Sequence, residues 1–409
     1  MSEAMRIPAP LKHADFRAYL FGAFFGLVGM WILRVTTAWL AWELTGSAGL
    51  VGLVAFLNFA PTMVSGPVFG VLADRADPRL GMMATQTAQA LVAVVLAKTV
   101  LAEELTLPLL ALLALLSGVA ASAYHPLRMT LAPRLVPAEI LPQAVAMTAL
   151  NFNMTRMIGP AVGGWLIAAA GAGAAPVLAA LLFAPQIWAL MSLPPQPPAP
   201  RAEGPHGFRR FVADLTEGAR HVRGRPAILE AFLLSGLFAV AGRGVLELLP
   251  AAADGLYGRG AAGLGALTAA AGAGAILSSI WLGRSAPDLA EMRRRARAAS
   301  AVGLALVAAL AAIPLWALAL AAVAGLGAAG TVVGVSTQSI AQTGTPDRIR
   351  GRVMSLWILV GIGGAAGGAL GLGALGDLVG LRAALLIGAG GSAAALAGLG
   401  RRRGVAPAE

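Results

Sequence analysis

Long apolar runs alternate with short polar connections along the whole chain. Each run is close to the length of about 20 residues that a transmembrane helix needs. The runs are continuous and lack the alternation of inward and outward residues that marks a membrane β-barrel. The pattern therefore predicts an all-α polytopic membrane protein with twelve transmembrane helices. The twelve runs lie at about 17–43, 48–73, 80–101, 107–127, 143–169, 173–193, 227–251, 263–283, 298–314, 315–337, 353–374 and 381–400.

One long polar segment, 194–226, separates six runs from six. It opens with PPQPPAPRAEGPHG and continues as FRRFVADLTEGARHVRGRP. The proline-rich start predicts an extended linker, and the basic continuation predicts a short amphipathic helix at the membrane surface. We therefore expect an N-terminal six-helix bundle over 1–193, a cytoplasmic linker over 194–226 and a C-terminal six-helix bundle over 227–409.

The two halves share a weak internal similarity. A shift of 209 residues places VPAEI (136–140) on TPDRI (345–349) and Arg34 on Arg243. Chance similarity between Ala- and Gly-rich helices is the alternative explanation. Parallel repeats of this kind hold a substrate site at their interface near the bilayer midplane, and rocking of the halves alternates its access.

Composition and charge add an orientation. Apolar residues make up 58% of the chain and charged residues 12%, the net charge is +11, and there is no cysteine, which excludes disulfides and thiolate metal sites. In a membrane protein such a basic excess indicates the positive-inside rule and not nucleic-acid binding. Placing both termini in the cytoplasm puts 24 of the 30 basic residues there and leaves Lys98, Arg259 and Arg382 outside. The sequence predicts a multi-pass protein of a bacterial-type inner membrane.

Two motifs resemble the major facilitator superfamily. The connection after the second run, GVLADRADPR, is similar to its G-x-x-x-D-R-x-G-R-[KR] loop, with departures at Asp77 and Pro78. The fifth run carries R-x-x-GP-x-x-GG, which resembles the fifth-helix signature of exporters in that superfamily. LKHADFRAYLFG (11–22), WLAWELTGS (39–47), YHPLRMTLAPRLVP (124–137) and TPDRIRGRVMSLW (345–357) resemble its enterobactin-exporter-like, or transmembrane secretion effector, branch. The motif residues are Gly70, Asp74, Arg75 and Arg79 in the loop, and Arg156, Gly159, Pro160, Gly163 and Gly164 in the fifth run.

This resemblance implies two six-helix bundles and efflux of a small molecule by alternating access, coupled to inward proton movement. It also implies a gating role for Asp74 and Arg75, for which Arg350 and Arg352 in RIRGR are the candidate second-half counterparts. The alternative for these residues is a solvated basic loop that sets orientation. The glycines of the fifth run are expected to serve close helix packing. We expect a monomer that contacts membrane lipid and uses no cofactor or metal.

Charged residues inside spans are the candidates for chemistry, because insertion of such a side chain costs at least about 2.5–3.5 kcal/mol. Arg243 and Glu247 are four residues apart and fit either a functional pair or a structural ion pair. Glu247 is the candidate proton site. Arg34 indicates a site for an anionic substrate. Alternatively, its side chain extends to the membrane–water interface. Glu230 is expected to be solvated. Arg156 with Asn151 and Asn153 either lines the path or bonds between helices.

Enzyme signals are weak throughout. Three G-x-G-x-x-G matches lie at 258–263, 325–330 and 371–376, but such matches arise easily by chance in a chain with 52 glycines. None follows the strand that a dinucleotide site needs. The sequence contains no G-x-x-x-x-G-K phosphate loop and no H-E-x-x-H pair. The sequence therefore predicts a transporter and not an enzyme. Uncoupled or substrate-driven transport is one alternative. A non-transporting membrane partner or sensor that uses the basic segment 201–225 is another.

Overall fold

The structure is a computed structural model that describes residues 8–75, 77–197, 208–285 and 287–401, with side chains described outside 64–75, 208–211, 400 and 401. All regular elements in these ranges are helical. Ten helices are long and apolar enough to cross a membrane, and Ala48–Met63 is a shorter apolar helix. The protein is therefore an all-α polytopic membrane protein, as the apolar runs predict.

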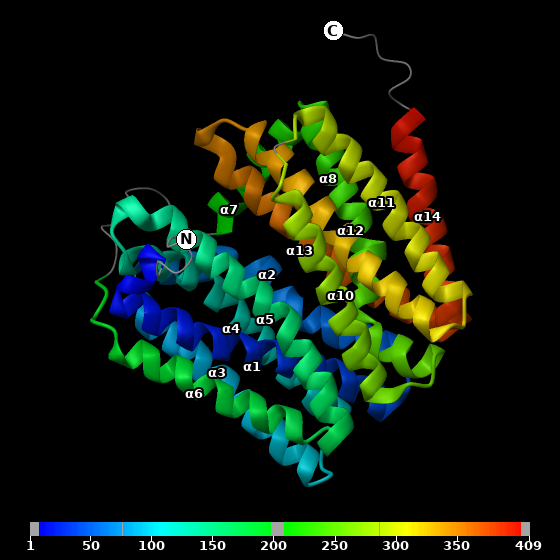
Figure 1. Ribbon diagram of the computed structural model, residues 1–409, viewed down its shortest axis with the longest axis horizontal. Helices are drawn as coiled ribbons and strands as arrows, with labels where there is room; N and C mark the ends of the chain where they lie inside the picture. The colour runs from blue at the N-terminus through cyan, green and yellow to red at the C-terminus, as the bar shows by residue number, and fades with distance from the viewer. Residues whose placement is uncertain (1–7, 76, 198–207, 286, 402–409) are drawn as a thin grey trace, which may run out of the picture. The chain divides into compact units, whose positions relative to one another are not determined.

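Each of the first six runs corresponds to one helix (Figure 1). A 3-10 turn, η1 (Ala9–Lys12), precedes the first of them, and η2 (Ala132–Leu135) and η3 (Ala138–Ile140) connect the fourth and fifth. The fifth helix carries polar residues in its middle and is not among the ten. The six helices are α1 (Ala14–Thr45), α2 (Ala48–Arg75), α3 (Pro78–Leu101), α4 (Leu107–Leu131), α5 (Leu141–Ala170) and α6 (Ala174–Ser192).

The second six runs follow a separate linker helix, α7 (Phe208–Arg223). The seventh run is interrupted by two π-helical turns, so that it consists of α8 (Pro226–Phe238), η4 (Ala239–Arg243), α9 (Gly244–Glu247) and η5 (Ala251–Leu256). Such turns contain one extra residue and occur frequently at functional sites. The remaining helices are α10 (Gly260–Leu282), α11 (Leu289–Ala312), α12 (Trp316–Thr343), α13 (Asp347–Val379) and α14 (Leu381–Arg401).

The chain divides into two compact units. The first contains Met1–Thr37 and Val64–Phe208, and the second contains Ala38–Met63 and Arg209–Glu409. The boundary therefore falls inside α1 and α2. The C-terminal end of α1 and the N-terminal half of α2 pack with the helices of the second unit.

In the first unit, α3 packs against α4 and α6. The core at one end of this unit includes Phe16, Tyr19, Met82 and Leu190. Polar groups are buried in the same unit and satisfied by each other: Gln86 Nε2 donates to Gln186 Oε1 at 2.7 Å, and Gln186 Nε2 donates to Tyr124 Oη at 2.9 Å. Hydrogen bonding of this kind is required where no water is available.

In the second unit, small residues allow backbones to approach closely. A Cβ atom on Gly274 of α10 would overlap Ala324 O of α12, and one on Gly327 of α12 would overlap Ala271 O of α10. Membrane helices associate through such small-residue contacts. Helix α12 also packs against α11, which in turn packs along α14 (Figure 1). The glycine-rich composition thus produces backbone contact between α10 and α12.

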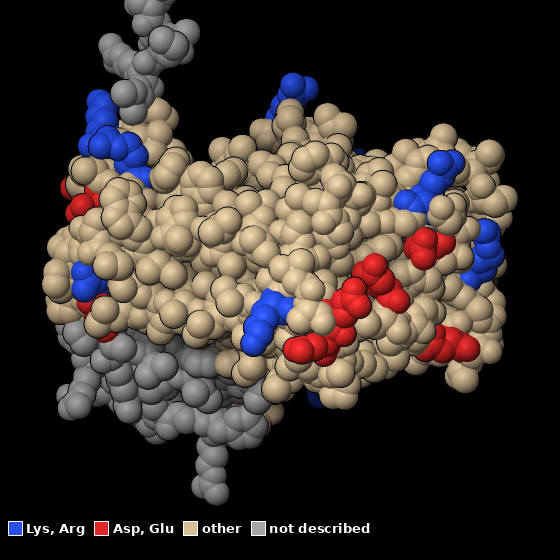
Figure 2. All heavy atoms as spheres, turned by 90° about the horizontal axis from the view of Figure 1, so that it is seen from below, with Lys and Arg blue, Asp and Glu red and all other residues tan. Residues whose placement is uncertain are grey.

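Large apolar side chains are exposed along the helices, among them Trp188, Leu181 and Leu277. Figure 2 shows broad areas of one face with neither acidic nor basic side chains. In a soluble protein an extended apolar surface would be an association site. Here it is the surface that faces lipid.

Candidate functional site

Arginine and aromatic side chains from three helices of the first unit come together. The Trp31 ring of α1 lies edge-on to the Phe152 ring of α5, with centroids 5.9 Å apart. The Arg34 guanidinium carbon is 5.3 Å from the Trp31 ring centroid, and that of Arg128 from α4 is 4.9 Å from the Phe152 ring centroid. These distances are typical of cation–π contacts. The two rings thus contact each other and one guanidinium group each, and we call these four residues the aromatic–arginine cluster.

Two polar atoms near this cluster are buried without a hydrogen-bond partner among the described residues. They are the indole Nε1 of Trp31 and the phenol oxygen of Tyr19. A buried donor without a partner costs about 1–3 kcal/mol.

Helix α5 positions the cluster through its glycines. A Cβ atom on Gly159 would overlap Trp31 Cβ, and one on Gly163 would lie 2.7 Å from Val35 Cγ1. Gly164 is also buried, and Pro160 lies within the helix. The motif residues of α5 therefore bring the backbone of this helix directly against α1.

The polar residues of α5 differ in their surroundings. Asn151 is buried and donates from Nδ2 to Leu20 O of α1 at 3.0 Å. Asn153 and Arg156 are exposed at the surface of the described structure. Asn151 thus bonds between helices, which is one of the two roles that the sequence left open for this group.

In the second unit, Arg243 is the last residue of the π-helical turn η4. Its guanidinium lies beside two glycines, with Nη2 3.2 Å from a Cβ position on Gly334 of α12 and Nη1 3.8 Å from one on Gly361 of α13. Larger residues at these glycines would contact the guanidinium. Glu247 lies one turn later, at the end of α9, and its role together with Arg243 stays a prediction.

Two aspartates of the second unit hold the end of α1 and the start of α2. Trp42 Nε1 donates to Asp254 Oδ2 at 2.9 Å. Asp377 Oδ2 accepts from Ser47 Oγ at 2.6 Å and from Gly49 N at 3.1 Å. Asp377 therefore caps the N-terminus of α2, where a carboxylate is favoured by both hydrogen bonding and the helix dipole. Because the partners are hundreds of residues apart in sequence, no local pattern indicates these contacts.

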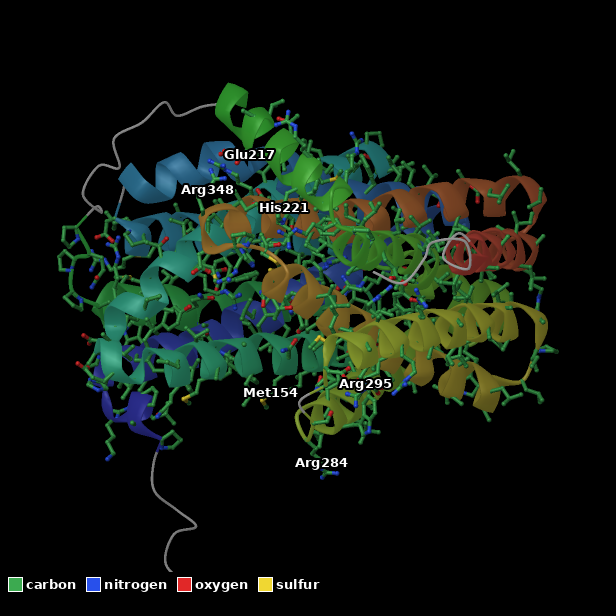
Figure 3. The ribbon with its side chains drawn as sticks, turned by 90° about the horizontal axis from the view of Figure 1, so that it is seen from above. Met154, Glu217, His221, Arg284, Arg295 and Arg348 are labelled. Carbon is green, nitrogen blue, oxygen red and sulfur yellow. The ribbon has the colours of Figure 1, made fainter. Side chains whose placement is uncertain are left out.

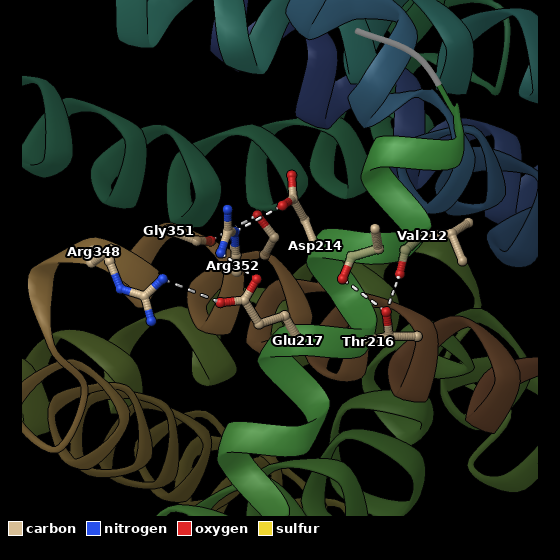
Figure 4. A network of polar contacts seen from close by, with 9 residues as sticks. Val212, Asp214, Thr216, Glu217, Arg348, Gly351 and Arg352 are labelled. Carbon is tan, nitrogen blue, oxygen red and sulfur yellow. Dashed lines mark hydrogen bonds and ion pairs between the residues drawn. The ribbon is translucent and has the colours of Figure 1, made fainter. Parts of the chain in front are cut away.

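The linker helix α7 is fixed to α13 by ion pairs (Figure 4). Arg352 Nε lies 2.7 Å from Asp214 Oδ1, and its Nη1 bonds Glu217 Oε2. Arg348 Nη1 lies 3.7 Å from Glu217 Oε1, and Figure 3 also shows these two side chains close together. Arg350 instead bonds within its own region, to Asp347 and the carbonyl oxygens of Gln342 and Thr345. Of the two predicted gating arginines, Arg352 thus contacts α7 and Arg350 does not.

The predicted gating loop after α2 is only partly described. Gly70, Asp74 and Arg75 lie among the residues whose side chains are outside the described part. Arg79 Nη1 donates to Leu193 O at 2.5 Å. Asp77, a departure from the family motif, accepts from Arg79 N at 2.8 Å as the N-cap of α3 and from Gln196 N at 3.1 Å. An Asp-Pro pair before an apolar run is a helix-start signal, so this capping role was detectable in the sequence.

The expectation that Glu230 is solvated is wrong. Its side chain is only 5% exposed. It accepts from two arginines of α11, from Arg293 Nε at 3.0 Å and from Arg297 Nε. Residue spacing cannot show this pairing, because the two helices are more than 60 residues apart in sequence. Among the described residues no group of three His, Cys, Asp or Glu residues has the arrangement of a metal site.

Solved structures share the fold of this chain. The chain superposes on the nucleoside transporter NupG with a TM-score of 0.69 at 13% identity, covering 95% of this chain and 98% of that one. It superposes on a bacterial homologue of the human lysosomal transporter Spinster, in an inward-facing and occupied conformation, with a TM-score of 0.72 at 13% identity, covering 95% and 96%. These likenesses establish the fold.

Sequence comparison identifies the family of the chain. A family model described as transmembrane secretion effector matches residues 7–403. The chain is 30% identical over 371 residues to the enterobactin exporter EntS of Shigella boydii serotype 4 (strain Sb227), covering 90% of this chain and 86% of that protein. EntS of Escherichia coli O6:K15:H31 (strain 536 / UPEC) matches with the same identity and coverage. The chain belongs to the transmembrane secretion effector family of the major facilitator superfamily, whose members here are transporters of small molecules and not enzymes.

Proposed function

We propose that this transporter exports a small amphipathic or anionic molecule, siderophore- or drug-like, across a bacterial inner membrane. The observation that supports this most directly is the aromatic–arginine cluster of Trp31, Arg34, Arg128 and Phe152. Guanidinium groups bind carboxylate, phosphate or catecholate oxygens, and aromatic rings stack on a ring-bearing substrate. The relatives named as enterobactin exporters support the direction of transport.

The proposed mechanism is alternating access of two six-helix bundles, 1–193 and 227–409, with both termini and the 194–226 linker in the cytoplasm. Transport is driven by protons that move inward. Glu247 is the proposed proton site, and Arg243 is the neighbouring charge that tunes it. A carboxylate that exchanges protons must separate from its arginine during turnover, so both residues are required for coupling in this mechanism.

The test uses inverted membrane vesicles that contain the full chain and a pH-sensitive dye. Siderophores, catechols, organic anions and lipophilic drugs are added in turn after a proton gradient has formed. We expect one of these classes to dissipate the gradient in the wild type, and Arg34→Gln to reduce that response about tenfold through loss of one charge-assisted contact. Glu247→Gln should abolish the proton response while leaving counterflow of the substrate intact.

The matched control is Arg259→Gln, which removes one arginine outside the cluster. Counterflow of the substrate in the wild type that does not depend on the proton gradient would contradict proton coupling and would support facilitated transport. An unchanged response in both Arg34→Gln and Glu247→Gln would contradict the assigned residues. A folded and inserted wild type that moves none of these compounds would favour the partner or sensor role.

A further inference from the structure

A group of arginines lies at the N-terminal end of α11. Arg293 and Arg297 are one turn apart and both bond the carboxylate of Glu230 on α8. Their neighbours Arg294 and Arg295 share the carboxylate of Glu291. The four guanidinium groups therefore face two carboxylates. A local excess of positive charge remains at this end of the second unit.

The side chains of Arg293 and Arg297 are 31% and 42% exposed, whereas the Glu230 side chain between them is 5% exposed. The carboxylate lies beneath the guanidinium groups and holds them in place. One carboxylate offsets one of the two charges. Two positioned guanidinium groups that still face solvent are a suitable partner for a phosphate group, which they contact through paired N–H donors.

An apolar hollow begins directly beside these arginines. It is lined by Glu230 and Leu234 of α8, by Arg297, Ala298 and Ala301 of α11, and by Leu396 and Leu399 of α14. A second hollow, lined by Arg293, Arg294 and Arg297, adjoins it and shares the Arg297 and Ala298 side chains. Figure 3 shows Arg295 and Arg284 at this end of the second unit, where α11 begins. The basic surface is thus continuous with an apolar groove between three membrane-spanning helices.

We propose that this groove binds an anionic phospholipid, with its phosphate on Arg293 and Arg297 and an acyl chain along Leu234, Leu396 and Leu399. The combination of charge at the end of the helices and apolar side chains along them is complementary to a lipid and not to a soluble anion, which would leave the leucines uncovered. Basic pockets between transmembrane helices bind acidic lipid headgroups for this reason. The inference is independent of the exported substrate and of proton coupling.

The experiment is native mass spectrometry of the full chain released from detergent, with phosphatidylglycerol and phosphatidylcholine of identical acyl chains as probes. We expect the wild type to retain phosphatidylglycerol in preference to phosphatidylcholine. Arg293→Gln with Arg297→Gln should weaken this retention by about fivefold per arginine. The matched control is Arg259→Gln with Arg348→Gln, which removes the same charge elsewhere and should retain the lipid. Equal retention by both double variants would overturn the proposal.

Two further measurements keep the test decisive if the double variant folds poorly. On the wild type alone, melting temperature is measured with phosphatidylglycerol, phosphatidylcholine, and inorganic phosphate as the headgroup without chains. We expect an upward shift with phosphatidylglycerol only. Equal shifts with both lipids would mean that the arginines do not select the headgroup, and an equal shift with phosphate would assign the site to a soluble anion; either result overturns the proposal. Arg293→Lys with Arg297→Lys, which keeps the charge, should retain more lipid than the glutamine pair.

Discussion

Trp42 and Asp254, which are 212 residues apart, are joined by a hydrogen bond of 2.9 Å from the indole nitrogen to a carboxylate oxygen. The Trp42 ring also lies against Gly255, where a Cβ atom would be 2.8 Å from Cη2 of the indole. The end of α1 is therefore attached to the π-helical turn η5. A hydrogen bond to a charged group contributes about 1.5–3 kcal/mol.

The first prediction concerns this bond. Asp254→Ala should release the end of α1 from η5. The rate at which a cysteine next to Trp42 is labelled should then rise about fivefold or more. The chain has no cysteine, so Glu43→Cys, at an exposed position next to Trp42, can report labelling rate with a maleimide. The control is Glu104→Ala, which removes an exposed acid in the connection between α3 and α4. An equal labelling rate in both backgrounds would show that the bond does not hold α1.

The second prediction concerns the cap that Asp377 provides for α2. Asp377→Ala should lower the free energy of unfolding by about 1 kcal/mol, since it removes acceptors for the Ser47 hydroxyl and the Gly49 amide. A double-mutant cycle with Ser47→Ala, read by thermal melting in detergent, should give a coupling free energy of similar size. Additive effects of the two substitutions would mean that the 2.6 Å contact is energetically neutral.

The third prediction concerns the ion pairs between α7 and α13. Arg352→Gln removes the contacts to Asp214 and Glu217, and such half-exposed pairs contribute up to about 1 kcal/mol. We expect trypsin to cleave after Arg220 and Arg223 about fivefold faster in this variant. Arg350→Gln, which touches Asp347 and not α7, is the control. Cleavage at the wild-type rate in Arg352→Gln would show that other contacts hold the helix.

The fourth prediction concerns the contact between α10 and α12. Gly327→Ala places a methyl group on the Ala271 carbonyl and should destabilise the protein by about 1–3 kcal/mol, because two packed backbones must separate. Gly371→Ala in α13, where nothing lies within 4 Å of the new atom, should be neutral or stabilise by about 0.5–1 kcal/mol through reduced freedom of the unfolded chain. Thermal melting of the two variants separates packing from helix propensity.

The helices were predictable because lipid imposes one requirement on every span, a long apolar stretch with internal hydrogen bonds. The motif of α5 was also informative, since its glycines indicate close approach even though α1 as the partner does not follow from them. Interactions between distant segments were not predictable in this way. The expectation for Glu230 was wrong because Arg293 and Arg297 lie on another helix, and the partners of Trp42 and Ser47 are known only once the chain has folded.

The π-helical turns of the seventh span were not predictable either. Arg243 ends one of them, η4, in the middle of a continuous apolar run. A π turn forms where local packing outweighs regular hydrogen bonding, and no residue pattern in AVAGR specifies it. The unit boundary inside α1 and α2 has the same origin, because it depends on which neighbours the two helices meet.

The two π-helical turns η4 and η5 give the seventh span spare length on both sides of Glu247. If a π turn tightens into an α turn, the stretch beyond it rotates by about 100° and shifts by about 1.5 Å along the axis. Such a change breaks no covalent bond and leaves the backbone hydrogen bonded throughout. The stretch between the two π turns can therefore rotate about the helix axis while both ends of the span stay in place. A side chain on this stretch, such as Glu247, then changes the direction in which it points.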